Sequence, residues 1–315
     1  MSFPFWSTEN FQTFNRIALE TEEHSLSYDE LDKEVDNLNK ILSNYGLKNH
    51  LAFLPMQSDK ESIVRYLACL RGSIVPLMLP SDIDESLLSN LIKIYQPSIL
   101  FGQNGIDDIQ IYESNLQKDL LPDELAILLS TSGSTGSSKL VRLSYTNIES
   151  NADAISEYLQ IDSYQKAFCT LPLSYSYGIS ILNSHFKSGA CIRLSSLSPF
   201  DNQYYHELIE SRATSISGVP FFYQMLFRTG FFEKKIPSLK VMTQAGGKLS
   251  EKLALKFSEY ANQHAIDFYI MYGQTEATAR ISYVPSKKLG QKIGSVGIAI
   301  PGGELSLSKN KELIY

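Results

Sequence analysis

A chain of 315 residues is long enough to bury a large core, either as one big domain or as two layered subdomains. Hydrophobic residues make up 43% and charged residues 20%, which is ordinary for a soluble globular protein. The net charge of −6 argues against a polyanionic partner, and no basic stripe with interleaved aromatics supports nucleic-acid binding.

The cysteines and the apolar segments carry no sign of metal binding, secretion or membrane insertion. Cys69, Cys169 and Cys191 lack metal-ligand spacing and lie in apolar surroundings, so we expect them to be buried and reduced. No apolar run reaches the roughly 18 residues that a membrane span needs. The N-terminus has no basic region followed by an apolar segment. We therefore expect a cytoplasmic protein with no membrane span.

The first part of the chain alternates helical and strand patterns. Ser27–Glu30 fits a capping box, and apolar residues follow at helical spacing. Apolar runs at Leu51–Met56 and Ile74–Leu79 predict buried strands, and Ser58 or Asp59 can cap the helix between them. The pattern continues with a helix near Ser86–Tyr95 and strands at Ser98–Phe101 and Glu124–Leu129.

The rest of the chain repeats this alternation after a Ser/Gly segment at Ser130–Lys139. We predict helices at Asn147–Leu159, Ile179–Lys187, Tyr204–Ser211, Phe221–Phe227 and Glu251–Asn262, and strands at Ala167–Leu171, Cys191–Leu194, Thr214–Ser217, Leu239–Thr243 and Asp267–Met271. The alternation predicts an α/β fold with mostly parallel sheets covered by helices. In such sheets ligands bind beyond the carboxyl ends of strands. Ser130–Lys139 and Tyr272–Glu276 each follow a predicted strand directly.

The segment Ser130–Lys139 has the composition of a phosphate-binding loop. Gly133 and Gly136 let the backbone come close to a ligand and turn its N–H groups toward one point. Further donors and a positive charge come from Thr131, Ser132, Ser134, Thr135 and Lys139. The alternative is a flexible Ser/Gly linker, but the segment is expected to join an apolar strand to a helix. A Walker A loop is excluded by spacing, because Gly136 is not followed by Lys.

The segment Tyr272–Glu276 supplies the groups that a nucleotide needs. The ring of Tyr272 can lie along a base, and the Tyr272-Gly273-Gln274 turn follows a strand. The hydroxyl of Thr275 can reach an α-phosphate, and the carboxylate of Glu276 can hold Mg²⁺. A solvated acid at a helix start is the alternative for Glu276 alone.

Thr131–Lys139 and Tyr272–Glu276 resemble the two signature segments of the adenylate-forming superfamily. That superfamily includes acyl-CoA synthetases, adenylation domains of nonribosomal peptide synthetases and beetle luciferases. The resemblance implies the large N-terminal AMP-binding domain, with Lys139, Thr275 and Glu276 as catalytic groups. It further implies that Thr275 contacts the AMP phosphate and that Glu276 coordinates magnesium.

Other segments resemble this superfamily in the same order along the chain. Gln244–Ser250, with Gly246, Gly247 and Lys248, resembles the Gly-rich turn beside the adenine. Gly218-Val219-Pro220 resembles the turn before a helix of the acyl pocket, to which we also assign Met271. Ile293–Gly297 and Pro301–Leu305 resemble the segments that follow, so the resemblance covers essentially the whole chain.

One segment of the acyl pocket departs from the common pattern. Leu171–Gly178 resembles a Pro-Leu-Phe-His-x-x-Gly stretch, with Tyr175 where His is usual. Ser176 follows, where amino-acid-activating domains generally have an Asp that pairs with the substrate ammonium. A buried ammonium would be uncompensated beside Ser176. We therefore expect an acyl or aryl carboxylate as substrate, and we interpret Tyr177 as an ordinary core aromatic.

The resemblance implies ATP-dependent activation of a carboxylic acid, with Mg²⁺, and later transfer to CoA or to the phosphopantetheine of an acyl carrier protein. Superfamily members continue with a hinge and a mobile C-terminal domain, which we cannot assign here. We therefore expect residues 1–315 alone to bind ATP weakly and to adenylate poorly, which robust pyrophosphate exchange would contradict. The alternative is a catalytically incompetent nucleotide- or acyl-binding module.

Overall fold

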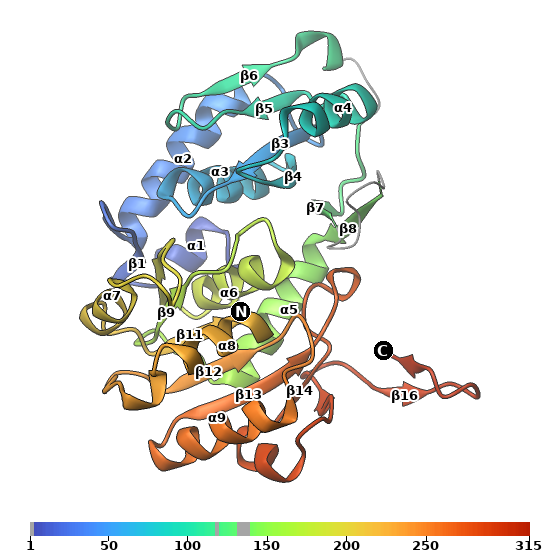
Figure 1. The fold of residues 1–315 in the computed structure, drawn as a ribbon. Coiled ribbons are helices and arrows are strands. Elements are labelled where there is room, and N and C mark those ends of the chain that lie inside the picture. Colours follow the sequence, from blue (N-terminus) through green and yellow to red (C-terminus); the bar gives the residue numbers. More distant parts are fainter. Residues whose placement is uncertain (1–2, 117–119, 131–138) are drawn as a thin grey trace.

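The computed structural model describes residues 3–116, 120–130 and 139–315, and these form two β-sheets with helices between and outside them (Figure 1). The predicted α/β fold with mostly parallel sheets is confirmed. The first sheet is built from the first 144 residues, and most of the second follows it in the chain.

The six-stranded sheet has a parallel centre and two antiparallel edges. Its order is β6 (Ile109–Ile111), β5 (Ile99–Phe101), β3 (Leu51–Met56), β4 (Val75–Pro80), β7 (Leu125–Ser130) and β8 (Leu140–Ser144). Strands β5, β3, β4 and β7 run parallel. Both faces of these central strands are covered, which explains why they are almost continuously apolar.

The nine-stranded sheet follows the same plan on a larger scale. Its order is β15 (Ile298–Ala299), β14 (Ser282–Val284), β13 (Asp267–Tyr272), β12 (Val241–Gln244), β11 (Ser215–Gly218), β9 (Lys166–Cys169), β10 (Cys191–Leu194), β1 (Ile17–Glu20) and β2 (Ser25–Ser27). Strands β13 to β1 in this order are parallel. At the edges, β2 pairs antiparallel with β1, β14 with β13, and β15 with β14. A separate two-stranded ribbon joins β16 (Ser306–Leu307) and β17 (Leu313–Ile314).

Helices form three layers around the two sheets (Figure 1). They are α1 (Thr8–Phe11), α2 (Tyr28–Ser43), α3 (Lys60–Arg71), α4 (Glu85–Tyr95), α5 (Tyr145–Leu159), α6 (Ser176–Lys187), α7 (Tyr204–Glu210), α8 (Pro220–Arg228) and α9 (Glu251–Gln263). The middle layer of α2, α3, α5 and α6 shares one core with both sheets. The outer face of the six-stranded sheet is covered by α4, and that of the nine-stranded sheet by α7, α8 and α9.

The helix starts follow local capping chemistry. Ser27 and Glu30 form the expected capping box at the start of α2. Of the two predicted caps for α3, Asp59 is the one that accepts from the backbone of Ser62. A hydrogen bond of 3.1 Å from Tyr66 Oη to Asn183 Oδ1 ties α3 to α6 inside the middle layer.

The segment after Ser130 differs from the prediction. We expected it to join a strand to a helix, but it joins β7 to the antiparallel strand β8, and α5 begins only after Ser144. In this hairpin Ser130 pairs with Leu140. The strand was missed because Leu140–Ser144 is short and is followed at once by the stronger helical pattern. Thr131–Ser138, the body of the predicted phosphate loop, lies outside the described residues.

All three cysteines are buried and free, as expected. Within the described residues, no helix combines the length and the hydropathy needed to cross a membrane.

Candidate active site

The order of strands in the nine-stranded sheet defines where a ligand can bind. From β9 the chain moves to β10 on one side, and then crosses to β11, β12 and β13 on the other. Because these strands are parallel, their carboxyl ends lie at one edge, and the reversal between β9 and β11 opens a crevice there. Tyr175 and Ser176 follow β9, and Gly218 and Val219 close β11. This topology is that of an α/β protein with a ligand site at a switch point.

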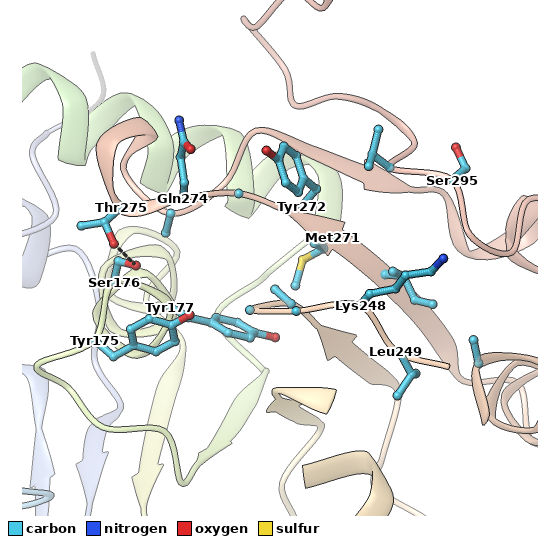
Figure 2. A pocket seen from close by; sticks show the side chains of 18 of the residues that line it. Tyr175, Ser176, Tyr177, Lys248, Leu249, Met271, Tyr272, Gln274, Thr275 and Ser295 are labelled. Carbon is cyan, nitrogen blue, oxygen red and sulfur yellow. Dashed lines mark hydrogen bonds between the residues drawn. The ribbon is translucent and has the colours of Figure 1, made fainter. Parts of the chain in front are cut away.

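A cavity of about 590 Å³ lies at this edge (Figure 2). Its wall combines residues from the ends of β9, β12 and β13 and from the segment before β15. Eleven of the predicted site residues line it: Tyr175, Ser176, Gly246, Gly247, Lys248, Met271, Tyr272, Gly273, Gln274, Thr275 and Glu276. Segments from Tyr175 to Val296, about 120 residues apart in the sequence, therefore meet around one space, whose size suits a nucleotide or a similar ligand.

The turn after β12 approaches the cavity through its glycines. Gly246 has a φ of +75° and Gly247 a φ of +152°, conformations that side-chain-bearing residues rarely adopt. A Cβ on Gly246 would lie 2.9 Å from Tyr175 Oη and 3.0 Å from Val219 Cγ1. Gln244 braces the turn, because its Nε2 donates to the carbonyl of Gly247 at 2.9 Å. The backbone is thus held open toward the ligand space.

Gly218 and Val219 stand one layer behind this turn. Gly218 pairs with Gln244 across β11 and β12, and Val219 contacts the position of Gly246 from outside the cavity wall. Neither is among the residues that line the cavity. They support the Gly-rich turn, and their assignment to the substrate pocket remains a prediction.

Thr275 and Ser176 meet at one end of the cavity. Thr275 Oγ1 lies 3.3 Å from Ser176 Oγ, and either hydroxyl can donate (Figure 2). Both side chains are nearly inaccessible to solvent. Ser176 is the first residue of α6, so the pair lies where the free N–H groups of that helix favour negative charge.

Glu276 has the exposure expected of a carboxylate that binds a ligand. It is exposed and lines both the main cavity and a neighbouring polar cavity of about 700 Å³. Within residues 3–116, 120–130 and 139–315, it has no ion pair and no hydrogen bond to another side chain. Its oxygens are therefore available to Mg²⁺, which takes one or two carboxylates together with phosphate oxygens and water.

The chain after Glu276 is held in an unusual conformation. Thr278 and Ala279 have φ angles of +57° and +86°, which costs free energy in residues other than glycine. The turn brings Ala279 against Gly273, where an added Cβ would lie 2.6 Å from the carbonyl carbon of Ala279. Gly273 is therefore required by close packing of two backbone segments.

The predicted phosphate loop starts beside this site. Ser130, Tyr175 and Ser196 line a further cavity of about 550 Å³, where the carboxyl ends of strands from both sheets meet. Lys139 directly precedes β8, the other strand of the same hairpin, but it lines a separate cavity of about 500 Å³ near His50. The structure therefore does not bring Lys139 together with Thr275 and Glu276.

Sequence reasoning missed several residues of the main cavity. Tyr177 is buried, as expected of a core aromatic, yet it also lines the cavity. Its hydroxyl donates to the carbonyl of Thr243 at 3.0 Å, and burial raises its pKa to about 12. Other lining residues without a prior assignment are Ala245, Leu249, Ala254, Ile270, Ala279, Gly294, Ser295 and Val296. For the last three, the resemblance of Ile293–Gly297 was a usable signal.

Residues 6–313 match the family described as AMP-binding enzyme, and the chain belongs to that family. Among curated relatives, it is 24% identical to a 2-succinylbenzoate–CoA ligase of Bacillus cereus over 326 residues. That match covers 98% of this chain and 66% of the ligase, so the chain spans slightly less than two thirds of that relative. It is also 26% identical to the PKS-NRPS hybrid synthetase acdB of Aspergillus candidus, over 81% of this chain and 10% of the synthetase.

Solved structures show the same fold at low sequence identity. VinN in complex with L-aspartate is 20% identical, with a TM-score of 0.84 and coverage of 98% of this chain and 85% of that one. The o-succinylbenzoate coenzyme A synthetase MenE of Bacillus subtilis, in complex with ATP and a magnesium ion, is 20% identical, with a TM-score of 0.81. That likeness covers 99% of this chain and 68% of MenE, which has also been solved with the acyl-adenylate intermediate OSB-AMP.

Proposed function

We propose that the main cavity binds MgATP and a carboxylic acid and joins them as an acyl-adenylate. The observation that carries this proposal is the meeting of Thr275, Glu276, Ser176 and the Gly246–Lys248 turn around one cavity at the switch point of a parallel sheet. Membership of the AMP-binding enzyme family supports it. The complexes of MenE with ATP and magnesium and with an acyl-adenylate support the same chemistry.

The proposed step needs charge stabilisation and positioning more than proton transfer. A carboxylate oxygen of the acid attacks the α-phosphorus of ATP, and the bond from that phosphorus to the bridging oxygen breaks. Pyrophosphate leaves with the electron pair. Thr275 donates a hydrogen bond to the α-phosphate, and Ser176 holds the Thr275 hydroxyl in place.

The remaining groups bind the nucleotide. Gly246 and Gly247 present backbone to the adenosine, and Tyr272, which is 39% exposed, has its ring free to lie along the base. We assign the polyphosphate to the loop 131–138, and Lys139, which lines a separate cavity in this structure, could join it only after a rearrangement of the hairpin. Glu276 is the carboxylate that would hold magnesium, which when bound neutralises phosphate charge.

The acid is proposed to be an acyl or aryl carboxylate. Ser176 provides no carboxylate for a substrate ammonium group, and Met271 and Tyr177 give part of the cavity an apolar wall. A 2-succinylbenzoate–CoA ligase among the relatives supports CoA or a carrier-bound pantetheine as the later acceptor. Because the chain spans 66% of that ligase, this second transfer is a proposal for the whole protein.

Equilibrium binding of MgATP to wild type and to Glu276→Gln tests the assignment. The substitution should raise the dissociation constant of MgATP at least about tenfold, since a hydrogen bond to a charged group is worth about 1.5–3 kcal/mol. AMP without magnesium should bind equally well to both. The control is Glu251→Gln at the rim of the site, where Glu251 lies 3.9 Å from Lys248 and both are exposed.

The outcomes separate enzyme from binding module. Unchanged MgATP affinity in Glu276→Gln would show that the metal role is wrong. Binding of AMP but of no acyl-adenylate analogue would favour a nucleotide-binding module instead.

A further inference from the structure

Arg280 is a buried cation just behind the wall of the main cavity. It is 1% exposed and belongs to the largest fully buried side chains of the described residues. One guanidinium nitrogen, Nη1, donates to Tyr158 Oη at 3.0 Å and to Met271 Sδ at 2.6 Å. The other, Nη2, donates to Ser180 Oγ at 3.2 Å, and Nε has no partner within the described residues.

Every one of these partners is electrically neutral. Within the described part of the chain, no carboxylate lies within 4.0 Å of Arg280, whereas Arg71 pairs with Asp32 at 2.6 Å and Arg193 with Glu207 at 2.9 Å. A buried charge without a counter-charge is strongly unfavourable unless something else compensates it. The face of the Tyr177 ring compensates part of this charge, and no anionic group among the described residues compensates the rest.

Arg65 is a buried arginine away from the main cavity, and its Nε, like that of Arg280, has no partner within the described residues. It is 2% exposed, and its guanidinium donates to the carbonyls of Gly102 at 2.6 Å, of Gly105, and of Asp108 at 3.4 Å. Carbonyl oxygens concentrate negative partial charge around the cation. Arg280 has a thioether, a phenol, a serine hydroxyl and the face of the Tyr177 ring instead, none of which carries a negative charge.

The place of Arg280 connects it with the ligand space. Its Cζ lies 4.4 Å from the centre of the Tyr177 ring, and both Tyr177 and Met271 line the main cavity (Figure 2). Ser180, its third partner, lies one helical turn after Ser176 on α6, and Ser176 contacts Thr275. One layer of side chains thus separates the guanidinium from the cavity. Through so thin a wall of low polarity, its field reaches a bound ligand.

We propose that Arg280 is a specificity-determining residue that makes the acyl part of the cavity select acids with a second anionic group and reject acids with an ammonium group. The inference rests on the proposed function, because it concerns the acid that becomes the acyl-adenylate. Arg280 acts through its charge without touching the ligand, since Tyr177 and Met271 stand between. Thr278 and Ala279, the two residues before Arg280, have positive φ angles.

The test uses non-hydrolysable 5′-O-(N-acylsulfamoyl)adenosines of three kinds: alkanoyl, ω-carboxyalkanoyl and ω-aminoalkanoyl, matched in length and made in several lengths. Dissociation constants are measured by calorimetry. Wild type should bind the best carboxyalkanoyl analogue at least about tenfold tighter than the best aminoalkanoyl analogue. Arg280→Met should bring these two constants within about threefold of each other and leave the alkanoyl constant nearly unchanged.

Three further variants keep the result interpretable. Arg280→Lys retains the charge and should retain the preference, and Arg280→Gln gives a second neutral side chain that should lose it. Lys256→Met removes one positive charge that does not line the cavity, on α9 over the Phe227 ring, and should leave the preference unchanged. If the role of Arg280 were merely structural, Arg280→Met would change the dissociation constants of all three analogues by a similar factor.

The alkanoyl analogue separates the two proposals. If wild type binds it but shows no preference between the charged analogues, or if Arg280→Met and Arg280→Gln keep that preference, the role of Arg280 is overturned and the proposed function stands. If wild type binds no acyl analogue at all, the proposed function fails and the inference fails with it.

Discussion

The six-stranded and nine-stranded sheets are both parallel in their centres, and near each lie a buried arginine, a buried histidine and a closely approached glycine. In the six-stranded half these are Arg65, His50 and Gly102. Their counterparts in the nine-stranded half are, in the same order, Arg280, His185 and Gly273. The same residue types thus occur in two settings of one architecture.

The difference is in how their polar atoms are satisfied. Arg65 is surrounded by backbone carbonyls, and His50 Nδ1 lies 2.9 Å from Ser98 Oγ. Nε is buried without a partner among the described residues in both arginines, and so is His185 Nε2. The two arginines differ in the kind of partner that their terminal nitrogens have: backbone carbonyls at Arg65, and neutral side chains beside the main cavity at Arg280.

The largest expected effect distinguishes the two glycines. In Gly273→Ala the new methyl group would overlap the carbonyl of Ala279, which is backbone, so we expect a loss of about 4 kcal/mol or more in unfolding free energy. In Gly102→Ala the methyl group meets the carboxylate of Asp108, a side chain that can turn away, so the loss should be about 1 kcal/mol. Urea unfolding gives the unfolding free energy of each variant. Equal losses of unfolding free energy in the two variants would contradict this distinction between the two glycines.

A smaller effect concerns the two histidines and depends on pH. Burial lowers the pKa of His185 from 6.5 to about 4, while its bond to the carbonyl of Ile181 opposes the shift and the charge of Arg280 adds to it. Between these pH values the unfolded chain binds more protons than the folded one. Unfolding free energy should therefore fall as the pH drops from 6.5 toward 4, by up to about 3 kcal/mol.

His185→Leu should remove this part of the pH dependence, as measured by urea unfolding between pH 4.5 and 7. Burial also lowers the pKa of His50, so His50→Leu should flatten the curve in the same direction. A pH profile that is unchanged in His185→Leu would show that His185 titrates normally in the folded protein.

The smallest effect compares the two arginines in the absence of ligand. Arg65→Met removes one donor from each of three backbone carbonyls, of which those of Gly105 and Asp108 keep a backbone N–H donor, and should lower the unfolding free energy by about 2 kcal/mol. Arg280→Met replaces an uncompensated buried cation by an apolar side chain and should be neutral or stabilising. Thermal unfolding of the ligand-free variants measures both changes in stability. If Arg280→Met loses more stability than Arg65→Met, Arg280 serves mainly to stabilise the fold.

Much of the fold could be predicted from local patterns. Apolar runs and capping residues placed β3, β4, α2 and α9 within about two residues, because periodicity and capping are properties of the segment itself. The short strands β1, β2, β6, β8 and β14 were not predicted. Strands of three to five residues are too short to show a clear period of their own, and they are defined by the strands they pair with.

The site was predictable where a motif carries chemistry. Tyr272–Glu276 and Gly246–Lys248 could be identified because their residue types and order resemble a known family, and the structure places them around one cavity. Arg280 could not be assigned in the same way. Its significance depends on what it fails to contact, and only the packing of Tyr158, Ser180 and Met271 around it reveals that.

We propose that the main cavity binds the nucleotide and the acyl group together, as one acyl-adenylate. The most direct measurement compares the dissociation constants of AMP and of an acylsulfamoyl adenosine for the wild-type chain. We expect the best acylsulfamoyl adenosine to bind at least about a hundredfold tighter than AMP, as analogues of reactive intermediates do. Equal affinity for the two, or binding of AMP alone, would contradict it.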